Sequence, residues 1–378
     1  MLIAINAIFF QQNNLEGYGH YATEMVKRMA LAHPEHEFLL VFDRPFSPNF
    51  LFADNVKAIQ VGPAARHVPA FLYWYNISVV LALKKYKPAI WIQPYGFCSL
   101  TSSVPQLMVV HDLAFKHFPK QISWHQRWHY QQFTPKFLQK ATRVITVSEF
   151  SKKDIEEQYP HINKSIKVIP GAAREGFKPL SWEEKEQVKM SYTPEGNEYF
   201  ICVGGISPRK NLLNVLKAFS LFKKWHKTNM KLVIAGRLAW NYADFLQKLK
   251  TFKYKEEVIL TGYIQEEALQ KLTAAAYASI YVSNFEGFGL PMVEAMQAGV
   301  PVIAGKNSSM IEVGDTAALY ADPQNPKEIA EYMQLLYRDE QYRKVYIDRG
   351  LERAQLYSWD AAATAFWKEI MATVTVSA

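Results

Sequence analysis

Short runs of apolar and β-branched residues alternate along the chain with stretches whose apolar residues recur at helical spacing. In the first half, this pattern predicts strands at 2–10, 38–42, 90–93, 106–110, 144–147 and 166–169, with helices over 19–32 and 71–84. After a segment at 170–179 and a charged helix over 181–190, the rhythm restarts. The second half predicts strands at 199–203, 231–235, 258–261, 278–282 and 302–304, with helices over 212–225, 266–275 and 290–298. Alternation of this kind is typical of parallel sheets covered by helices.

Length and rhythm together predict two domains. A chain of 378 residues exceeds the usual size of one hydrophobic core, and the pattern breaks between 170 and 195. We expect an α/β protein with two Rossmann-like, doubly wound parallel sheets that face each other across an interdomain cleft. The domains would be 1–175 and 176–358, with a last helix in 359–378 packing back on the first domain. Ligands of open α/β sheets bind outside the carboxyl ends of the strands, so the cleft is where chemistry is expected.

Composition excludes several classes of protein. With 49% hydrophobic and 21% charged residues the chain is neither disordered nor fibrous. Its longest nearly apolar stretch, 71–83, is too short for the ~20 residues that span a bilayer, and the first ten residues resemble a strand more than a signal peptide. Cys98 and Cys202 lie in apolar surroundings, which favours core residues over a disulfide or a metal site. We expect a cytoplasmic protein, which could also bind to the inner face of the cell membrane.

The net charge of +8 belongs entirely to the first half of the chain. Up to Lys178 there are 20 basic and 12 acidic residues, and beyond it 23 of each. The segment 113–148 contains no acidic residue and interleaves basic with aromatic side chains. It is a solvated helix face with core aromatics, a peripheral contact with anionic lipid, or a nucleic-acid surface, the last without further support in the sequence. The candidate membrane or acceptor surface comprises Lys116, Lys120, Trp124, Arg127, Trp128, Lys136 and Lys140.

The most specific local string is Ser-Asn-Phe-Glu-Gly-Phe-Gly-Leu-Pro-Met-Val-Glu-Ala-Met at 283–296. It follows a predicted buried strand, passes through a glycine loop and enters a helix with Pro291 in its first turn. The backbone donors and the positive end of such a helix suit a phosphate or pyrophosphate. Glu286 and Glu294 flank the loop, and carboxylates in these positions could accept hydrogen bonds from the hydroxyls of a sugar or ribose. The alternative is a plain turn followed by an acid on a helix face.

This string resembles the Glu-x7-Glu signature of the retaining GT-B glycosyltransferases of family 4, also called glycosyltransferase group 1, and the resemblance spans the chain. The run Cys-Val-Gly-Gly-Ile-Ser-Pro-Arg-Lys-Asn at 202–211 resembles the lysine motif of that family, and 235–237, 260–263 and 307–312 resemble its later strand-end motifs. Gly17-Tyr-Gly19 and Val110-His111-Asp112 resemble its donor-side glycine loop and the histidine near the transferred sugar. The resemblance implies His111, Lys210 and Glu286 as catalytic residues. It implies a donor site of Gly17, Tyr18, Gly19, Gly204, Gly205, Arg209, Lys210, Arg237, Gly262, Tyr263, Glu286, Gly287, Phe288, Gly289, Leu290 and Glu294.

The chemistry that the resemblance implies needs neither a metal nor a cofactor. Lys210, with Arg209 beside it, would stabilise the negative charge that develops on a departing nucleoside diphosphate. In the front-face transfer favoured for the family, the acceptor oxygen attacks the face that the phosphate leaves, and no enzyme base is obligatory. Asp-x-Asp is absent from the chain.

Two details of the motifs leave roles open. Many relatives carry an arginine directly after the glycine, where this chain has Ile206, so Arg209 replaces it only if its side chain turns inward. His111 could bind a sugar hydroxyl through a ring nitrogen or its carbonyl, and Asp112 could orient that ring or cap the next segment.

The resemblance therefore implies a retaining, metal-independent hexosyltransferase that uses a nucleotide sugar. The Pro-Arg-Lys-Asn run resembles mannosyltransferase-like members, so GDP-mannose is the first expectation and a UDP-hexose the second. The acceptor would be a saccharide or lipid-linked saccharide in the assembly of a surface polysaccharide or glycolipid.

Three other functions stay open. The first is another sugar-nucleotide enzyme of this fold, an epimerase or hydrolase, and the second is a carbohydrate- or lipid-surface-binding protein without turnover. The third is an NAD-dependent oxidoreductase, because Gly17-x-Gly19-x-x-Ala22 with Asp43 loosely matches a dinucleotide fingerprint. The connection 11–16 is too long for its tight phosphate turn.

Overall fold

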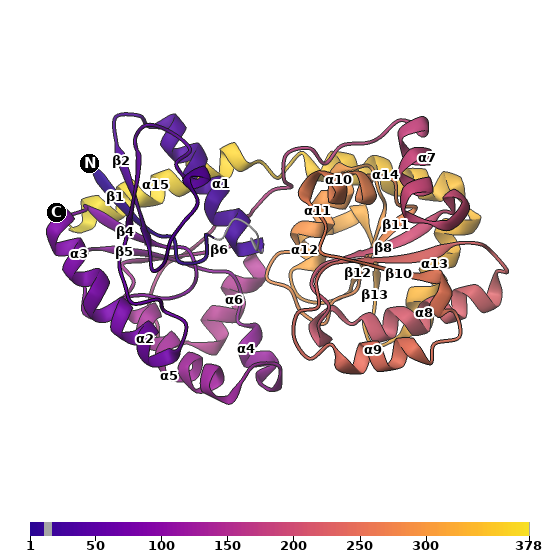
Figure 1. The fold of residues 1–378 in the computed structure, drawn as a ribbon, viewed down its shortest axis with the longest axis horizontal. Coiled ribbons are helices and arrows are strands. Elements are labelled where there is room, and N and C mark those ends of the chain that lie inside the picture. Colours follow the sequence, from indigo (N-terminus) through magenta and orange to yellow (C-terminus); the bar gives the residue numbers. More distant parts are fainter. Residues whose placement is uncertain (11–16, 378) are drawn as a thin grey trace. The chain divides into compact units, whose positions relative to one another are not determined.

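The computed structural model describes residues 1–10 and 17–377, which form two compact units. The first unit comprises Met1–Gly171 together with the C-terminal segment from Ser358, and the second comprises Ala172–Tyr357. Each unit is an α/β layer structure with helices around a central sheet (Figure 1).

The first unit is built on seven parallel strands in the order β3-β2-β1-β4-β5-β6-β7. The strands are β1 (Leu2–Asn6), β2 (Glu37–Phe42), β3 (Val56–Gln60), β4 (Ile90–Gln93), β5 (Gln106–Val110), β6 (Arg143–Thr146) and β7 (Ile166–Val168). The helices are α1 (Gly17–Ala32), α2 (Val68–Tyr73), α3 (Val79–Tyr86), α4 (Ala114–His117), α5 (Trp124–Lys140), α6 (Glu149–Gln158) and α15 (Trp359–Ser377), with a π-helical turn (Trp74–Ser78) joining α2 to α3. From β1 the chain first adds strands on one side of the sheet, as β2 and β3, and then on the other side, beginning with β4. Such a topological switch point opens a crevice at the carboxyl ends of the two neighbouring strands.

The C-terminal helix α15 completes this first unit by packing beside α1 (Figure 1). The rings of Tyr21 and Trp359 meet at 5.9 Å, and Trp367 stacks on His33 at 3.8 Å between centroids. The Arg28 Nε atom donates to Asp360 at 2.8 Å. Aromatic burial, more than this exposed ion pair, therefore holds the end of the chain on the unit in which it began.

The second unit repeats the architecture with six parallel strands in the order β10-β9-β8-β11-β12-β13. The strands are β8 (Tyr199–Val203), β9 (Lys231–Ala235), β10 (Val258–Gly262), β11 (Ala278–Tyr281), β12 (Val302–Gly305) and β13 (Ala318–Ala321). The helices are α7 (Trp182–Tyr192), α8 (Leu212–Trp225), α9 (Ala243–Lys250), α10 (Glu266–Ala274), α11 (Leu290–Gln297), α12 (Met310–Gly314), α13 (Pro326–Arg338) and α14 (Glu340–Ala354). Its central strands are buried on both faces, which explains their continuous apolar runs.

The fold class expected from the sequence is confirmed, and four strands have the predicted bounds: 90–93, 106–110, 199–203 and 231–235. The strand predicted at 2–10 was too long. It ends at Asn6, because the Phe10 amide turns back to the Ala7 carbonyl at 3.0 Å. Two strands were missed: β3 is half-exposed at the edge of its sheet, and β13, also an edge strand, has the sequence Ala-Leu-Tyr-Ala without a β-branched residue. Neither gives a strong periodic signal.

The predicted helix at 71–84 is instead divided among α2, the π-helical turn and α3. Cys98 and Cys202 are buried, unpaired thiols, as the sequence indicated. Along residues 1–10 and 17–377, every helix is too short or too polar to cross a membrane.

Candidate active site

The second unit places two opposing loops at the carboxyl ends of β8 and β11. After β8 the chain turns through Gly204, whose φ of 134° excludes most side chains, and a 3-10 turn (Pro208–Lys210) presents two cations. After β11 it passes through the loop at 283–289 and enters α11 at Leu290. A Cβ atom at Gly204 would lie 2.9 Å from the Lys210 Cε atom, so this glycine makes room for the lysine.

Arg209, Lys210, Tyr281 and Glu286 form what we call the charged cluster. The Lys210 Nζ atom donates to the Glu286 Oε1 atom at 2.7 Å and to the Tyr281 hydroxyl at 3.1 Å. The Arg209 Nη1 atom donates to the Glu286 Oε2 atom at 2.5 Å and to the Phe285 carbonyl at 2.8 Å. Arg209 therefore turns toward Glu286, which is the orientation it needs to act as a second cation beside Lys210.

The carboxyl group of Glu286 is ionised at any physiological pH. Burial raises its pKa, but the charges of Arg209 and Lys210 and the hydrogen bond from Lys210 outweigh burial and lower the pKa to about 2. Glu286 is only 6% exposed. The two cations more than compensate the charge of this buried carboxylate, so the three groups carry a net positive charge, and the carboxylate is able to accept hydrogen bonds from hydroxyl groups.

Serines at 308 and 309 hold the loop that carries Glu286. The Ser309 hydroxyl lies 2.8 Å from the Glu286 carbonyl and 3.0 Å from the Phe288 carbonyl, and the Glu286 amide donates to the Ser308 hydroxyl at 3.1 Å. The sequence predicted 307–312 as a strand-end motif, without this role. Gly287 and Phe288 are buried, and Gly289 has a φ of 108° directly before α11.

Glu294 lies inside α11 and is only 2% exposed. It forms a bidentate ion pair with Arg174. The Arg174 Nε atom is 2.6 Å from Oε1, and its Nη2 atom is 3.0 Å from Oε2. Its guanidinium also lies 5.2 Å from the centre of the Phe177 ring. Sequence analysis missed Arg174, and its only signal was a single arginine in the segment 170–179.

The other predicted donor residues of this unit gather at neighbouring strand ends. The Ile206 amide, after Gly205, donates to the Arg237 carbonyl at 2.9 Å, and the Gly236 amide donates to the Gly262 carbonyl at 3.0 Å. Tyr263 is 54% exposed, and the Arg237 side chain is also exposed. Among the residues that the structure describes, no three His, Cys, Asp or Glu side chains group as metal ligands would.

In the first unit, His111 follows β5 and is held at two points. Its Nε2 atom lies 2.9 Å from the Pro94 carbonyl, and its own carbonyl accepts from the Ser151 hydroxyl at 3.1 Å. Burial lowers its pKa below 6.5, although Pro94 and Asp112 oppose this. The ring is neutral near pH 7, and because a carbonyl can only accept, we assign the proton to Nε2 and the lone pair to Nδ1. The Asp112 carboxylate accepts from the Ala114 amide at 2.9 Å, so it caps the next segment.

Gly17, Tyr18 and Gly19 form the first turn of α1. The centroids of the Tyr18 and His111 rings are 6.3 Å apart. The structure therefore brings these two predicted site residues close together. The connection 11–16, on which the comparison with a dinucleotide fingerprint depended, lies outside the described residues. The Asp43 carboxylate already accepts from Arg44 and from the Ala65 amide, each at 2.7 Å.

The basic, aromatic segment 113–148 divides into a buried and an exposed face. Phe137 is buried in the core and Phe115 packs against Tyr130, whereas Trp124 and Trp128 are 70% and 50% exposed. Lys116 is half-buried, with its Nζ atom 4.9 Å from the centre of the Tyr159 ring. The exposed basic residues of the predicted surface are Lys120, Arg127, Lys136 and Lys140.

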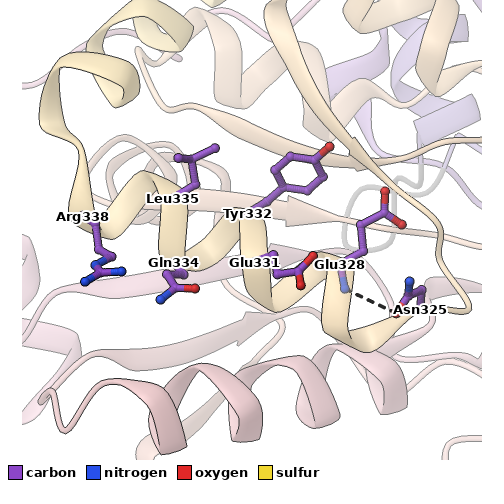
Figure 2. A pocket seen from close by; sticks show the side chains of 7 residues that line it. All are labelled: Asn325, Glu328, Glu331, Tyr332, Gln334, Leu335 and Arg338. Carbon is purple, nitrogen blue, oxygen red and sulfur yellow. Dashed lines mark hydrogen bonds between the residues drawn. The ribbon is translucent and has the colours of Figure 1, made fainter.

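A depression of about 560 Å³ also lies along one side of α13. Figure 2 shows that its lining comes from Asn325 and the successive turns of that helix. It contains none of the residues singled out from the sequence, and its polar atoms belong to a helix surface. We therefore locate the candidate site at the strand ends and not here.

Two parallel-sheet units, with the charged cluster and the Arg174–Glu294 pair at the strand ends of one of them, define a glycosyltransferase of the GT-B fold. Two family models cover most of the chain: Glycosyltransferase Family 4 matches residues 16–173, and Glycosyl transferases group 1 matches residues 183–353. The chain belongs to these glycosyltransferases, and the family expected from the sequence is confirmed.

Curated relatives of similar length share this assignment. The chain is 28% identical to O-antigen chain mannosyltransferase B of Escherichia coli over 360 residues, which are 93% of this chain and 94% of that one. It is 26% identical to O-antigen chain mannosyltransferase RfbU of Salmonella typhimurium (strain LT2), over 74% of this chain and 72% of that one. A solved sucrose-phosphate synthase from Thermosynechococcus elongatus superposes with a TM-score of 0.79 at 19% identity, over 98% of this chain and 99% of that one. This last likeness shows the shared fold.

Proposed function

We propose that the protein is a retaining, metal-independent mannosyltransferase that uses GDP-mannose. The acceptor would be a saccharide or lipid-linked saccharide in the assembly of a surface polysaccharide. The charged cluster carries the proposal, because it holds two cations and an ionised carboxylate together at the ends of β8 and β11. The names of the two mannosyltransferase relatives support mannose as the sugar. GDP as its carrier, in preference to a UDP-hexose, rests on the resemblance of the Pro-Arg-Lys-Asn run to mannosyltransferase-like members.

The cluster suits the departure of a nucleoside diphosphate. Negative charge grows on the diphosphate as the bond to the sugar breaks, and fixed cations lower the barrier most where that charge appears. Hydrogen bonds to Glu286 position Lys210 and Arg209. The amino end of α11, behind Gly289, adds a partial positive charge.

The retaining outcome follows from front-face transfer. The acceptor oxygen bonds to the anomeric carbon on the face from which the phosphate leaves, and its proton passes to that leaving phosphate. Glu286 is then free to bind donor-sugar hydroxyls, and Glu294 to bind the ribose, as in the family that the sequence resembles. Neither carboxylate has to act as a nucleophile.

Independence from metals and cofactors is part of the proposal. It is supported by the lysine and arginine that already supply positive charge, and it stays a prediction until it is tested. The test is a thermal-shift screen with GDP, UDP, ADP, dTDP and NAD, each with and without EDTA. We expect GDP to raise the melting temperature and EDTA to leave that shift unchanged. A shift with UDP alone would contradict the donor, loss of the shift in EDTA would contradict metal independence, and a shift with NAD alone would favour an oxidoreductase.

The exposed face of α5 is proposed to contact anionic lipid at the inner face of the cell membrane. Trp124 and Trp128 lie one helical turn apart, beside the exposed Arg127. Between residues 55 and 148 the chain has eleven basic residues, and Asp112 is the one acidic residue. Attraction of such a surface to anionic headgroups grows with each Lys or Arg near the lipid.

The membrane proposal is tested by sedimentation with vesicles that contain phosphatidylglycerol. Reversing Lys120, Arg127, Lys136 and Lys140 to Glu should abolish binding, with Lys116 left unchanged because it packs over Tyr159. The matched control reverses four exposed lysines of the second unit: Lys248, Lys250, Lys253 and Lys255. Equal binding by both variants would contradict a contact through α5.

A further inference from the structure

Four partly exposed rings gather at the carboxyl ends of β1, β4 and β5. They belong to Phe9, Tyr18, Tyr95 and His111, and we call them the aromatic box. The Phe9 and Tyr95 centroids are 4.6 Å apart, those of Tyr18 and Tyr95 are 5.8 Å apart, and those of Phe9 and Tyr18 are 5.7 Å apart. The large aromatics of this unit's core, Trp74 and Trp91 among them, are fully buried. The box is therefore a ring cluster that keeps access to solvent.

The box lies where a sheet of this topology binds ligands. The strand order turns at β1 and β4, which are hydrogen-bonded neighbours in the sheet, and Phe9 and Tyr95 follow these two strands. His111 follows β5, the next strand along. Open α/β sheets bind their ligands at such a switch point, beyond the carboxyl ends of the strands.

The Tyr95 hydroxyl is the feature that points to a ligand. It is buried, and within residues 1–10 and 17–377 it has no hydrogen-bond partner. Burial raises the pKa of Tyr95 well above its ordinary value of 10.0, so the hydroxyl keeps its proton and is able both to donate and to accept. Buried hydroxyls are almost always paired in native proteins, so an unpaired one needs an explanation. Three other residues of this unit, Trp91, His129 and Tyr159, also have a buried polar atom without a partner among the described residues, but these side chains belong to the interior and are at most 5% exposed.

A second polar atom of the box is available to the same ligand. The His111 ring is fixed through Nε2 on the Pro94 carbonyl, which leaves Nδ1 as an acceptor. The box thus offers the hydroxyls of Tyr18 and Tyr95, one imidazole acceptor and the surfaces of its rings, and of the two hydroxyls that of Tyr95 is the buried one without a partner among the described residues. It has no charged side chain of its own, unlike the charged cluster of the second unit.

We propose that the aromatic box binds a pyranose ring, with Tyr95 as a specificity-determining residue that hydrogen-bonds a sugar hydroxyl. This proposal rests on the proposed glycosyl transfer. The family resemblance already implies that His111 lies near the transferred sugar, and the proposal adds the Tyr95 hydroxyl and the Phe9 ring to that part of the first unit. A pyranose has apolar C–H faces for the rings and a rim of hydroxyls for Tyr95 and His111. A nucleobase suits the box less well, because Phe9, Tyr18 and Tyr95 meet pairwise at 76–84° and offer no parallel faces to enclose a flat base.

The decisive variant is Tyr95→Phe, which removes one oxygen atom and keeps the ring. If the Tyr95 hydroxyl forms a hydrogen bond with a bound sugar, its loss should weaken sugar binding about tenfold. The melting temperature should stay the same or rise, because an unpaired buried polar group has been removed. The matched control is Tyr159→Phe, in the same unit, where the ring packs beneath Lys116. The control should leave sugar binding unchanged.

Two titrations separate the sugar of the donor from that of the acceptor. Calorimetry compares GDP-mannose with GDP, and UDP-glucose with UDP, while saturation-transfer NMR follows methyl α-D-mannopyranoside with GDP present and absent. Weaker binding of the sugar nucleotide but not of its diphosphate would place the donor sugar in the box. Weaker binding of the mannoside would place the acceptor sugar there.

Two results would overturn the proposal: unchanged binding of every sugar probe by a folded Tyr95→Phe protein, or no binding of any of them by the wild type. The diphosphate arms test the proposed function separately. If wild type binds the mannoside through Tyr95 but binds no diphosphate, the box stands and the proposed donor chemistry fails.

Discussion

The two units carry strand-end sites of opposite character. In the second unit the functional side chains are ionic and already paired with one another: Lys210 and Arg209 with Glu286, and Arg174 with Glu294. In the first unit the groups of the aromatic box are neutral, and the buried hydroxyl of Tyr95 has no partner among the described residues. The difference matches the two halves of a nucleotide sugar, because a diphosphate is charged and a sugar is not.

The same difference decides what a substitution does. Removing one member of a buried ion pair leaves an uncompensated charge, so in the second unit stability and function fall together. Removing an unpaired hydroxyl costs the folded state nothing, so in the first unit function can fall alone. The comparison can therefore be tested by measuring stability and ligand binding on the same variants.

The largest effect on stability is expected for Arg174→Ala. It would leave the carboxylate of Glu294, 2% exposed, without its partner, at a cost of about 3–5 kcal/mol in the free energy of unfolding. Urea unfolding measures this directly. Arg174→Met combined with Glu294→Leu should recover much of the stability and none of the donor binding. A loss below 1 kcal/mol in the single variant would show that the pair is solvated.

Lys210→Ala should lower kcat/KM by about 10²–10³, because the proposed mechanism relies on this cation to stabilise the leaving group. Steady-state kinetics with GDP-mannose would show the change, with Lys217→Ala, an exposed lysine on α8, as the control. Arg209→Ala should have a smaller effect if the lysine carries most of the charge stabilisation. Full activity of both cluster variants would remove the charged cluster from the mechanism.

These cluster residues could be found from the sequence because they lie in compact local motifs. Lys210 follows a strand and a glycine pair, and Glu286 and Glu294 bracket a glycine loop that opens a helix. The structure then brings Lys210 and Glu286 to 2.7 Å from each other. Most strands were also predictable, because buried parallel strands are apolar along their whole length.

Arg174 and Tyr95 could not be found in the same way. Arg174 is 120 residues from Glu294 along the chain, and only the fold brings the two side chains together. Tyr95 is a single tyrosine after a strand, and its importance comes from a missing partner, which no sequence pattern records. The strand β13 was missed for a different reason, since its sequence Ala-Leu-Tyr-Ala contains two alanines, which are depleted in strands, and no β-branched residue.

The ionisation of the Glu286 carboxylate should contribute to the pH dependence of the unfolding free energy. Its pKa falls from 4.5 when unfolded to about 2 when folded, so its stabilising contribution is fully present above pH 4.5 and is lost as the pH falls toward 2. The expected size is about 3 kcal/mol. Comparison of the unfolding free energy of wild type and Glu286→Gln between pH 2 and 6 should give a smaller slope for the variant. Glu256→Gln, at an 89% exposed side chain, is the control and should follow wild type.

The smallest expected change in stability comes from removing a single tyrosine hydroxyl, and it should differ between the two units. The Tyr281 hydroxyl accepts from Lys210 at 3.1 Å, whereas the Tyr95 hydroxyl has no partner among residues 1–10 and 17–377. Tyr281→Phe should therefore lower the free energy of unfolding by about 1 kcal/mol and kcat/KM about fivefold, since Lys210 loses one of its hydrogen bonds. Tyr95→Phe should leave the unfolding free energy unchanged or raise it. The same chemical change would then have opposite consequences for stability in the two units, and equal losses of stability would mean that the Tyr95 hydroxyl is paired in solution and that the contrast between the two sites is smaller than the structure indicates.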